Sequence, residues 1–220
     1  MAWNTSQTIG TWEFAEAVQL DKHNGKESTL GIRLIMMLDP MGKAYYWLIH
    51  EHTKELKRDF GYGFYQHRRR EQAILVNHAV TGRLVQAARD AVRAGKNDFS
   101  FVIALRDISN AFPSLSHDCM RQVLEAHNDE WTAAQLRARH EQLEFRITTK
   151  QGESIILKNG CGGAQGDKVM PVQFRRVYEG LLEEWVDTKE QELDTGVKAK
   201  DPLTAKVVDV SMTSYADDVK

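Results

Sequence analysis

The chain has 220 residues, of which 42% are hydrophobic and 27% are charged, a balance typical of a globular protein of one or two domains. Its net charge of −2 means that no strong overall basicity marks it as a nucleic-acid-binding protein. With two cysteines and no apolar stretch long enough to span a bilayer, a disulfide-built secreted domain and a membrane protein are excluded, and we expect a soluble intracellular protein.

The first half of the chain predicts two helices and a strand. Apolar residues recur at helical spacing over about 44–58 and again over about 69–94, where Gly95 follows as a stop signal. The apolar run over 99–105 is bounded by polar residues, which predicts a buried strand. Asp107 follows this run, and a carboxylate at the end of such a strand is costly to bury unless it is paired or bound to metal.

Helix start signals recur in the second half. Ser116 predicts the N-cap of a helix that runs to about residue 126, and either Asp129 or Thr132 can open the next helix. A third helix is expected after Met170-Pro171, where an apolar pattern runs to about residue 189.

The same half predicts two hairpins. Segments 145–149 and 154–157 flank a polar turn that contains glycine, which is a good hairpin signal. A polar loop over about 190–202 precedes a second strand pattern, in which valines lead over 207–215 towards two aspartates. Taken alone, Asp217-Asp218 is better explained as the tight turn of an exposed hairpin, since Asp tolerates turn conformations.

Three short segments stand in the order that a template-directed polymerase palm needs. They are Asp107-Ile-Ser-Asn-Ala-Phe112, then Gln165-Gly166 with Pro171 and Phe174, then Tyr215-Ala-Asp-Asp218. In these residues the chain resembles the reverse transcriptase family, and most closely the RNA-directed DNA polymerases of LINE-type (non-LTR) retrotransposons and group II introns. The three segments resemble motifs A, B and C of that family.

Two upstream segments extend the resemblance. Gly31-Ile-Arg33-Leu-Ile35 with Gly42-Lys43 resembles the fingers segment that meets the triphosphate. Tyr62-Gly63-Phe64, followed by Arg68-Arg69-Arg70 and Ala73-Ile74, resembles the Gly-Phe and Arg pattern that precedes motif A in LINE-type enzymes. Landmarks in the correct order along most of the chain are hard to obtain by chance, so the sequence predicts a reverse transcriptase.

The resemblance implies an α+β fold with the fingers and palm of a right-hand polymerase. The palm would have βαββ order with an antiparallel catalytic hairpin. We expect a fingers-like segment over 1–98, a palm with the three motifs over 99–220, and a hairpin insertion over about 143–160. Because the sequence stops two residues after Asp218, we expect a fragment that is truncated after motif C and has no thumb.

The resemblance also implies a reaction, in which a primer 3′ hydroxyl attacks the α-phosphate of a deoxynucleoside triphosphate and pyrophosphate leaves. Two Mg²⁺ or Mn²⁺ ions would assist it, since these hard cations prefer oxygen ligands. The implied catalytic and metal-binding residues are Asp107, Asp217 and Asp218. The implied nucleotide-binding residues are Arg33, Lys43, Phe112, Gln165 and Gly166. An RNA template and a DNA primer are the implied partners, with contacts from Arg68, Arg69, Arg70 and Tyr215.

Several of these residues have other interpretations. A ring at Phe112 beneath the 2′ position would exclude ribose by a clash, yet a Phe after a strand is also an ordinary core residue. Lys43 is equally explained as a solvated charge. A charge run such as 68–70 is more often a solvated helix face than a template contact.

Departures from the family pattern leave the function open. Pro113 stands where LINE-type motif A has a further Asp, and Arg106 stands where an apolar residue is usual. Asp167 and Met170 fill motif B positions where small residues are common, and Asp167 would add a carboxylate near the predicted metal site. The alternative is a catalytically inactive retroelement remnant that acts at most as an RNA- or protein-binding module. An RNA-directed RNA polymerase is disfavoured by Phe112, because a polar group is expected there in such an enzyme.

Overall fold

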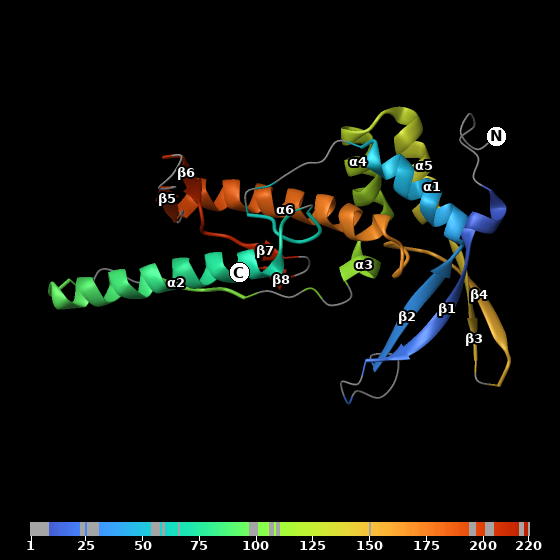
Figure 1. Cartoon of the computed structure of the whole chain (residues 1–220), viewed down its shortest axis with the longest axis horizontal. Helices are drawn as coiled ribbons and strands as arrows, with labels where there is room; N and C mark the ends of the chain where they lie inside the picture. Colours follow the sequence, from blue (N-terminus) through green and yellow to red (C-terminus); the bar gives the residue numbers. More distant parts are fainter. Residues whose placement is uncertain are drawn as a thin grey trace. The chain divides into compact units, whose positions relative to one another are not determined.

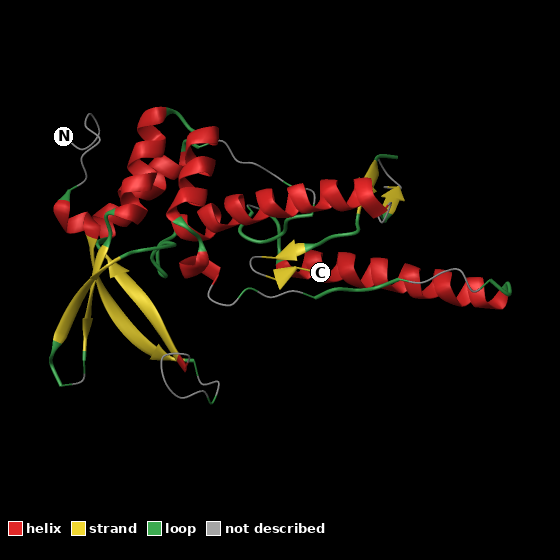
Figure 2. Ribbon diagram, turned by 180° about the vertical axis from the view of Figure 1, so that it is seen from behind, coloured by secondary structure: helices red, strands yellow, loops and turns green. Residues whose placement is uncertain are grey.

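The computed structural model, shown in Figures 1 and 2, divides by contacts into two compact units. Unit 1 comprises Met1–Glu55 and Asn110–Val177, and unit 2 comprises Leu56–Ser109 and Tyr178–Lys220. The structure describes residues 9–22, 25, 31–53, 58, 60–65, 67–96, 101–105, 108, 111–149, 151–193, 197–200, 205–215 and 218–219. Grouping by contact does not test the functional division, so fingers over 1–98 and palm over 99–220 remain a prediction.

Unit 1 is built on a four-stranded mixed sheet with the order β2-β1-β3-β4 (yellow in Figure 2). Strand β1 (Phe14–Asp21) follows a short 3₁₀ turn, η1 (Gly10–Glu13), and pairs antiparallel with β2 (Ile32–Leu38) and parallel with β3 (Glu144–Thr148). β3 pairs antiparallel with β4 (Ser154–Lys158). The predicted hairpin at 145–157 is therefore confirmed, and the α+β fold class with it.

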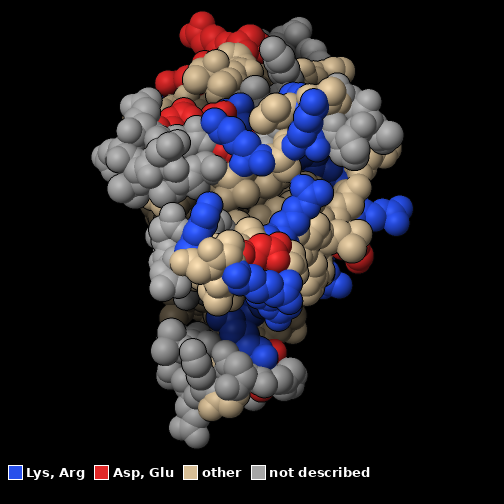
Figure 3. Space-filling model, turned by 90° about the vertical axis from the view of Figure 1, so that its left-hand side faces the viewer, with Lys and Arg blue, Asp and Glu red and all other residues tan. Residues whose placement is uncertain are grey.

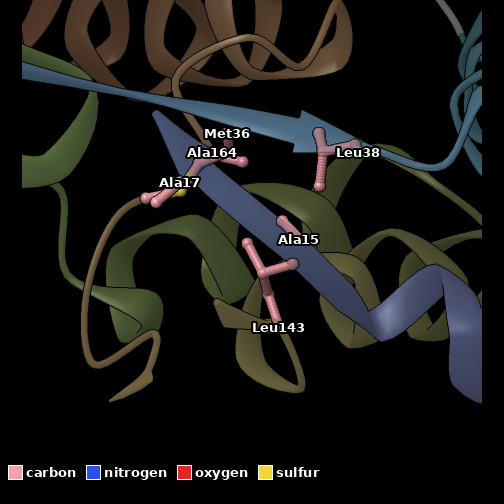
Figure 4. Close-up of a cluster of buried hydrophobic side chains, with 6 residues drawn as sticks. All are labelled: Ala15, Ala17, Met36, Leu38, Leu143 and Ala164. Carbon is pink, nitrogen blue, oxygen red and sulfur yellow. The ribbon is translucent and has the colours of Figure 1, made fainter. Parts of the chain in front are cut away.

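A small apolar core lies on one face of this sheet (Figure 4). Its buried members alternate along β1 and β2, as expected where one face of each strand is covered, and they are joined by residues ahead of β3 and of the last helix. The cluster consists of Ala15, Ala17, Met36, Leu38, Leu143 and Ala164. Ala164 stands next to the predicted motif B pair, so the core ties that segment to the sheet.

In the described part of unit 1 four helices lie wholly within the unit, and their start signals are local. They are α1 (Pro40–Glu51), α3 (Ala111–Ser114), α4 (His117–His127) and α5 (Glu130–Glu141). The side chain of Ser116 accepts a hydrogen bond from the Cys119 amide at 3.1 Å, and that of Asp129 accepts from the Thr132 amide at 2.9 Å. Both predicted caps are confirmed, and Asp129 rather than Thr132 opens α5. α1 begins and ends earlier than the predicted range of 44–58, because Asp39 caps it and Pro40 suits a first helical turn.

A second apolar cluster packs these helices together. Its members come from α1, α4, α5 and the first residue of α6 (Val169–Leu193), and they are Tyr46, Ile49, Leu124, Ala133, Leu136 and Val169. Trp12, Trp47 and Trp131 are partly buried against it. α6 confirms the helix expected after Met170, enters unit 2 at Tyr178 and continues to Leu193. The predicted loop over 190–202 is therefore wrong at its start, and it is wrong again at Lys198–Lys200, which form strand β5.

Unit 2 contains α2 (Arg70–Arg93), which confirms the second predicted helix, together with two short hairpins. β5 (Lys198–Lys200) pairs with β6 (Val207–Asp209), and β7 (Ser214–Tyr215) pairs with β8 (Asp218–Val219). The strand expected through 207–215 is thus interrupted, because the Asp209 carboxylate accepts from the amide and hydroxyl of Ser211 and bends the chain there. Within the described residues, no helix has the length and apolarity needed to cross a bilayer.

The buried strand expected over 99–105 is wrong for the part that is described. Residues 101–105 form no strand, and the side chains of Val102 and Leu105 are 93% and 72% exposed. An apolar run forms a buried strand only where neighbouring strands pair with it and another layer covers it. Within the described ranges no strand pairs with 101–105, so its apolar composition alone misled the prediction.

Candidate active site

The five predicted nucleotide-binding residues all belong to unit 1. Arg33 is exposed on β2, and Lys43 is half-buried in the first turn of α1. Phe112 is half-buried in α3, while Gln165 and Gly166 form the turn that precedes α6. The structure therefore brings all five residues into one compact unit, and their role in nucleotide binding remains a prediction.

The turn at Gln165-Gly166 is bonded directly to β2. The Met36 amide donates to the Gln165 carbonyl at 2.7 Å. Gly166 has φ +116°, and a Cβ there would lie 2.8 Å from the Met36 carbonyl oxygen, so the turn needs glycine both for its backbone conformation and for its close approach. This contact brings motif B to the strand that carries Arg33.

Phe112 packs against another predicted motif residue. Its ring lies edge to face with the ring of Phe174 on α6, with centroids 5.6 Å apart and an interplanar angle of 83°, a favoured aromatic geometry. Gly163 donates its amide to the Phe112 carbonyl at 3.4 Å, and Gly162 (φ +62°) has no room for a side chain beside Phe112 and Pro113. The glycine-rich loop therefore serves as packing for the motif A segment, and the role of Phe112 in sugar selection remains a prediction.

The carboxylate of Asp167 is buried in an ion pair. Its side chain is 1% exposed, and its Oδ2 lies 2.7 Å from Nε of Arg139, whose side chain is equally buried. Both carboxylate oxygens are engaged within unit 1, because Oδ1 accepts from the Val169 amide at 3.2 Å. The ion pair joins residues 28 positions apart and was not expected from the sequence. The expectation that Asp167 adds a carboxylate near the predicted metal site remains a prediction, because Asp107 and Asp217 lie outside the described residues.

The three predicted metal-binding aspartates lie largely outside the described part of the chain. Asp107 and Asp217 are not among the described residues, and only the backbone of Asp218 is described. Tyr215 on β7 is half-buried and pairs with Asp218 on β8 in an antiparallel register. Among the described residues there is no group of three His, Cys, Asp or Glu side chains that could hold a metal ion. The carboxylate site therefore remains a prediction from the motifs.

Strand β7, which belongs to the hairpin of the predicted motif C, is held by the segment that precedes α2. Ser214 donates its amide to the Phe60 carbonyl at 2.9 Å and accepts from the Tyr62 amide at 2.8 Å. Ser214 is itself buried. Both segments belong to unit 2, so the Gly-Phe region and motif C are joined by backbone hydrogen bonds.

Arg68 is engaged within that same segment. Its guanidinium donates to the carbonyls of Arg58 and Gly61, and it lies over the ring of Tyr65, 4.8 Å from the centroid. Arg69 and Arg70 are exposed at the start of α2. A nucleic-acid contact is a prediction for all three arginines, and the side-chain contacts described for Arg68 are with its own segment.

Two residues that the sequence analysis missed support this region. The Tyr65 hydroxyl donates to Oε2 of Glu179 on α6 at 2.5 Å, and both side chains are buried. Gly61 lies so close to Tyr65 and Glu179 that no Cβ fits there. Tyr65 could have been noticed because it follows Gly63-Phe64, but nothing near Glu179 in the sequence marks it.

Buried histidines in unit 1 are poor candidates for proton transfer near neutral pH. Burial, the largest cause, lowers the pKa of His140 to about 4. Burial together with the charges of Arg176 and Arg175 lowers the pKa of His50 to about 4. Both imidazoles are therefore neutral at pH 7, and we assign them to the structural core.

Comparison with known proteins identifies similar solved structures, all at low sequence identity. The structure of apo telomerase from Candida tropicalis truncated from its C-terminal domain matches with a TM-score of 0.51 and 11% identity, covering 98% of this chain and 44% of that one. Apo telomerase from the same organism matches with a TM-score of 0.50 and 10% identity, covering 97% of this chain and 40% of that one. No protein-family model and no curated protein matches the chain.

This chain thus spans less than half the length of the telomerase chains that it resembles. At such low identity the likeness concerns the fold alone. Telomerase is a reverse-transcriptase-related enzyme, and the matching region holds nearly all of this chain. The chain therefore has a mixed α+β fold that is similar to part of the telomerase chains.

Proposed function

We propose that this chain is the fingers and palm part of an RNA-directed DNA polymerase from a retroelement of LINE or group II intron type. One combined observation supports the proposal. The fold is similar to that of telomerase over 98% of the chain, and the sequence of this region has Asp107, Gln165-Gly166 and Asp217-Asp218 in the order of the polymerase motifs. The fold alone does not define an activity, because one fold hosts many functions. The motif residues therefore carry the chemical part of the argument.

The proposed reaction is nucleotidyl transfer to a primer 3′ hydroxyl. Three carboxylates are a suitable donor set for Mg²⁺ or Mn²⁺, and Asp107, Asp217 and Asp218 would hold two such ions. Once bound, the ions would neutralise charge that develops on the transferred phosphate. Arg33 and Lys43 would contact the β- and γ-phosphates, where guanidinium and ammonium donors stabilise negative charge.

The remaining nucleotide contacts would come from backbone and ring surfaces. Gly166 is exposed in a turn that β2 holds in place, so its peptide can approach base and sugar closely. Phe112 would lie beneath the sugar and exclude a 2′ hydroxyl by a clash, which favours deoxynucleotides.

An RNA template and a DNA primer are the proposed partners, and exposed basic residues of unit 2 support this proposal. Figure 3 shows a number of Lys and Arg side chains exposed to solvent, with Asp and Glu side chains among them. The exposed basic residues in and beside α2 are Arg69, Arg70, Arg83, Arg89, Arg93 and Lys96. Phosphate contacts from such residues would make binding of the template weaken with rising salt.

Primer extension tests the proposal. The chain is supplied with an RNA template, a DNA primer, deoxynucleoside triphosphates and Mg²⁺ or Mn²⁺, in parallel with Asp217→Ala and with Asp187→Ala, which alters an exposed acid on α6. We expect extension by the unsubstituted chain and Asp187→Ala, and none by Asp217→Ala. Absence of extension by a well-folded chain would refute the catalytic proposal.

An inactive remnant is the second candidate, and the exposed segment 101–105 ahead of Asp107 favours it. A remnant could still bind RNA or a protein partner. Thermal stability with and without Mn²⁺ separates the two candidates, since an ion that binds only the folded state raises the melting temperature. An intact carboxylate site predicts a rise that Asp107→Ala and Asp217→Ala abolish, whereas a decayed site predicts no rise in any of them.

A further inference from the structure

A buried ion pair lies directly behind the motif B turn. Arg139 on α5 and Asp167, one residue after Gly166, are joined at 2.7 Å, and both side chains are 1% exposed. A charge pair removed from water is costly unless its remaining donors and acceptors are also satisfied. Its partners therefore indicate what this pair holds in place.

Asp167 fixes the turn and the beginning of α6. Its Oδ2 accepts from Arg139, and its Oδ1 accepts from the Val169 amide at 3.2 Å, in the first residue of the helix. Its own amide donates to the Ala164 carbonyl at 3.1 Å, which closes the turn around Gln165-Gly166. Asp167 thus closes the turn through its backbone amide, and its carboxylate ties the end of the turn to Arg139 and to the first residue of α6.

Arg139 anchors the pair to the N-terminal part of unit 1. Its Nη1 donates to the Trp12 carbonyl in η1 at 2.7 Å, and its guanidinium lies 4.7 Å from the ring centroid of Tyr46 on α1. Burial raises the pKa of the Tyr46 hydroxyl, and the Arg139 charge opposes that rise. The guanidinium therefore joins α5, η1 and α1 to the turn.

On its other side the turn rests on β2. The Met36 amide donates to the Gln165 carbonyl at 2.7 Å, and the Met36 carbonyl oxygen lies where a Cβ on Gly166 would clash. Gly166 is exposed between these two supports, and Gln165 is half-buried. The turn is therefore supported by β2 on one side and by the residues that the ion pair joins on the other.

We infer that Arg139 and Asp167 are positioning residues, which hold the Gln165-Gly166 turn against β2 so that it meets the incoming nucleotide in a fixed geometry. The link to the nucleotide rests on the proposed function, whereas the link to the turn does not. Without the ion pair, the turn would spend a smaller fraction of time in the conformation that binds the nucleotide. This raises the KM for the nucleotide more than it lowers kcat.

The first experiment measures amide hydrogen exchange in the full chain without nucleotide. Asp167→Asn leaves one side-chain oxygen for two donors, so we expect the protection of the Met36 and Val169 amides to fall about tenfold or more. The double variant Arg139→Met/Asp167→Leu removes both charges without leaving one unpaired, and we expect the same two losses in a folded protein. The Ile147 amide in β3 serves as an internal reference that keeps its protection.

The matched control is Arg137→Gln on the same helix. Arg137 is 42% exposed and pairs with Glu125 and Glu141 at the surface, so its loss is expected to change none of these amides. Wild-type protection of Met36 and Val169 in either folded variant would overturn the inference. Loss at Ile147 as well in the double variant would also overturn it, because the pair would then support the whole unit rather than the turn.

The second experiment measures extension of oligo(dT) on poly(rA) with deoxythymidine triphosphate and Mg²⁺. We expect the KM for the nucleotide to rise about tenfold in both Asp167 variants with a smaller change in kcat, and no change in Arg137→Gln. If the wild-type chain is active and the Asp167 variants lose hydrogen-exchange protection but keep the wild-type KM, the proposed link between the turn and the nucleotide is overturned. If the wild-type chain extends no primer, the proposed function fails, and the exchange measurement alone decides the positioning role.

Discussion

Replacement of Gly166 by alanine should destabilise unit 1 by about 2–4 kcal/mol. A residue with a Cβ at φ +116° carries backbone strain of about 1–3 kcal/mol. The added Cβ would lie 2.8 Å from the Met36 carbonyl oxygen, which is backbone and cannot swing aside. Relief of that clash separates the turn from β2 and weakens the hydrogen bond from Met36 to Gln165, worth about 0.5–1.5 kcal/mol.

Urea unfolding followed by tryptophan fluorescence suits this measurement, because Trp12, Trp47 and Trp131 pack around the second apolar cluster of unit 1. The expected loss corresponds to a fall in melting temperature of roughly 4–16 °C for a protein of this size. Gly160→Ala is the matched control, since Gly160 lies in the same unit and a Cβ there meets nothing within 4 Å. Equal stabilities of Gly166→Ala and Gly160→Ala would refute the argument that the turn is held against β2.

Three further predictions concern other parts of the two units. The pKa of His140 is lowered to about 4 in the folded protein, whereas an unfolded His titrates near 6.5. The stabilising contribution of the neutral imidazole to the unfolding free energy is therefore complete above pH 6.5 and is lost as the pH falls towards 4. His140→Gln should therefore flatten the dependence of unfolding free energy on pH in that window, and an unchanged slope would contradict the assignment. Tyr65→Phe removes the hydroxyl that donates to Glu179, and we expect the unfolding free energy measured by urea titration to fall by about 1–3 kcal/mol. Glu184→Gln, which alters an exposed residue of the same helix as Glu179, should leave it unchanged. Asp129→Ala removes the cap of α5 and should cost about 1 kcal/mol by the same titration, and a loss below about 0.3 kcal/mol would exclude a capping role.

Local signals in the sequence predicted the helices well. Ser116 and Asp129 sit at the caps of α4 and α5, and the apolar spacing over 69–94 matches α2 within a residue at each end. A helix is specified by neighbours a few positions away, so its signals lie within a short window. The hairpin of β3 and β4 was equally local, because its turn and both strands are contiguous.

Features that depend on distant partners were missed or predicted wrongly. β1 is paired with β3 across most of the chain, and its alanines and glutamate do not resemble a strand-forming run. Residues 101–105 do resemble one, yet the described part of the chain supplies them no partner strand. In the candidate site, Gly166 was identified from the motif, whereas the pairing of Asp167 with Arg139 depends on a tertiary contact that no spacing rule predicts.

The parallel pairing of β1 with β3 has a consequence for the order of events during synthesis. β1 ends at Asp21 and β3 begins at Glu144, so 122 residues (22–143) separate the two strands. At about 5–20 residues per second, the ribosome needs roughly 6–25 s to make that stretch. Through this interval the edge of β1 that later pairs with β3 stays open, in addition to the outer edge of β2, and an open strand edge can pair with other nascent chains. We therefore expect the yield of soluble protein to depend on chaperones that bind early, more than the stability of the finished fold would indicate.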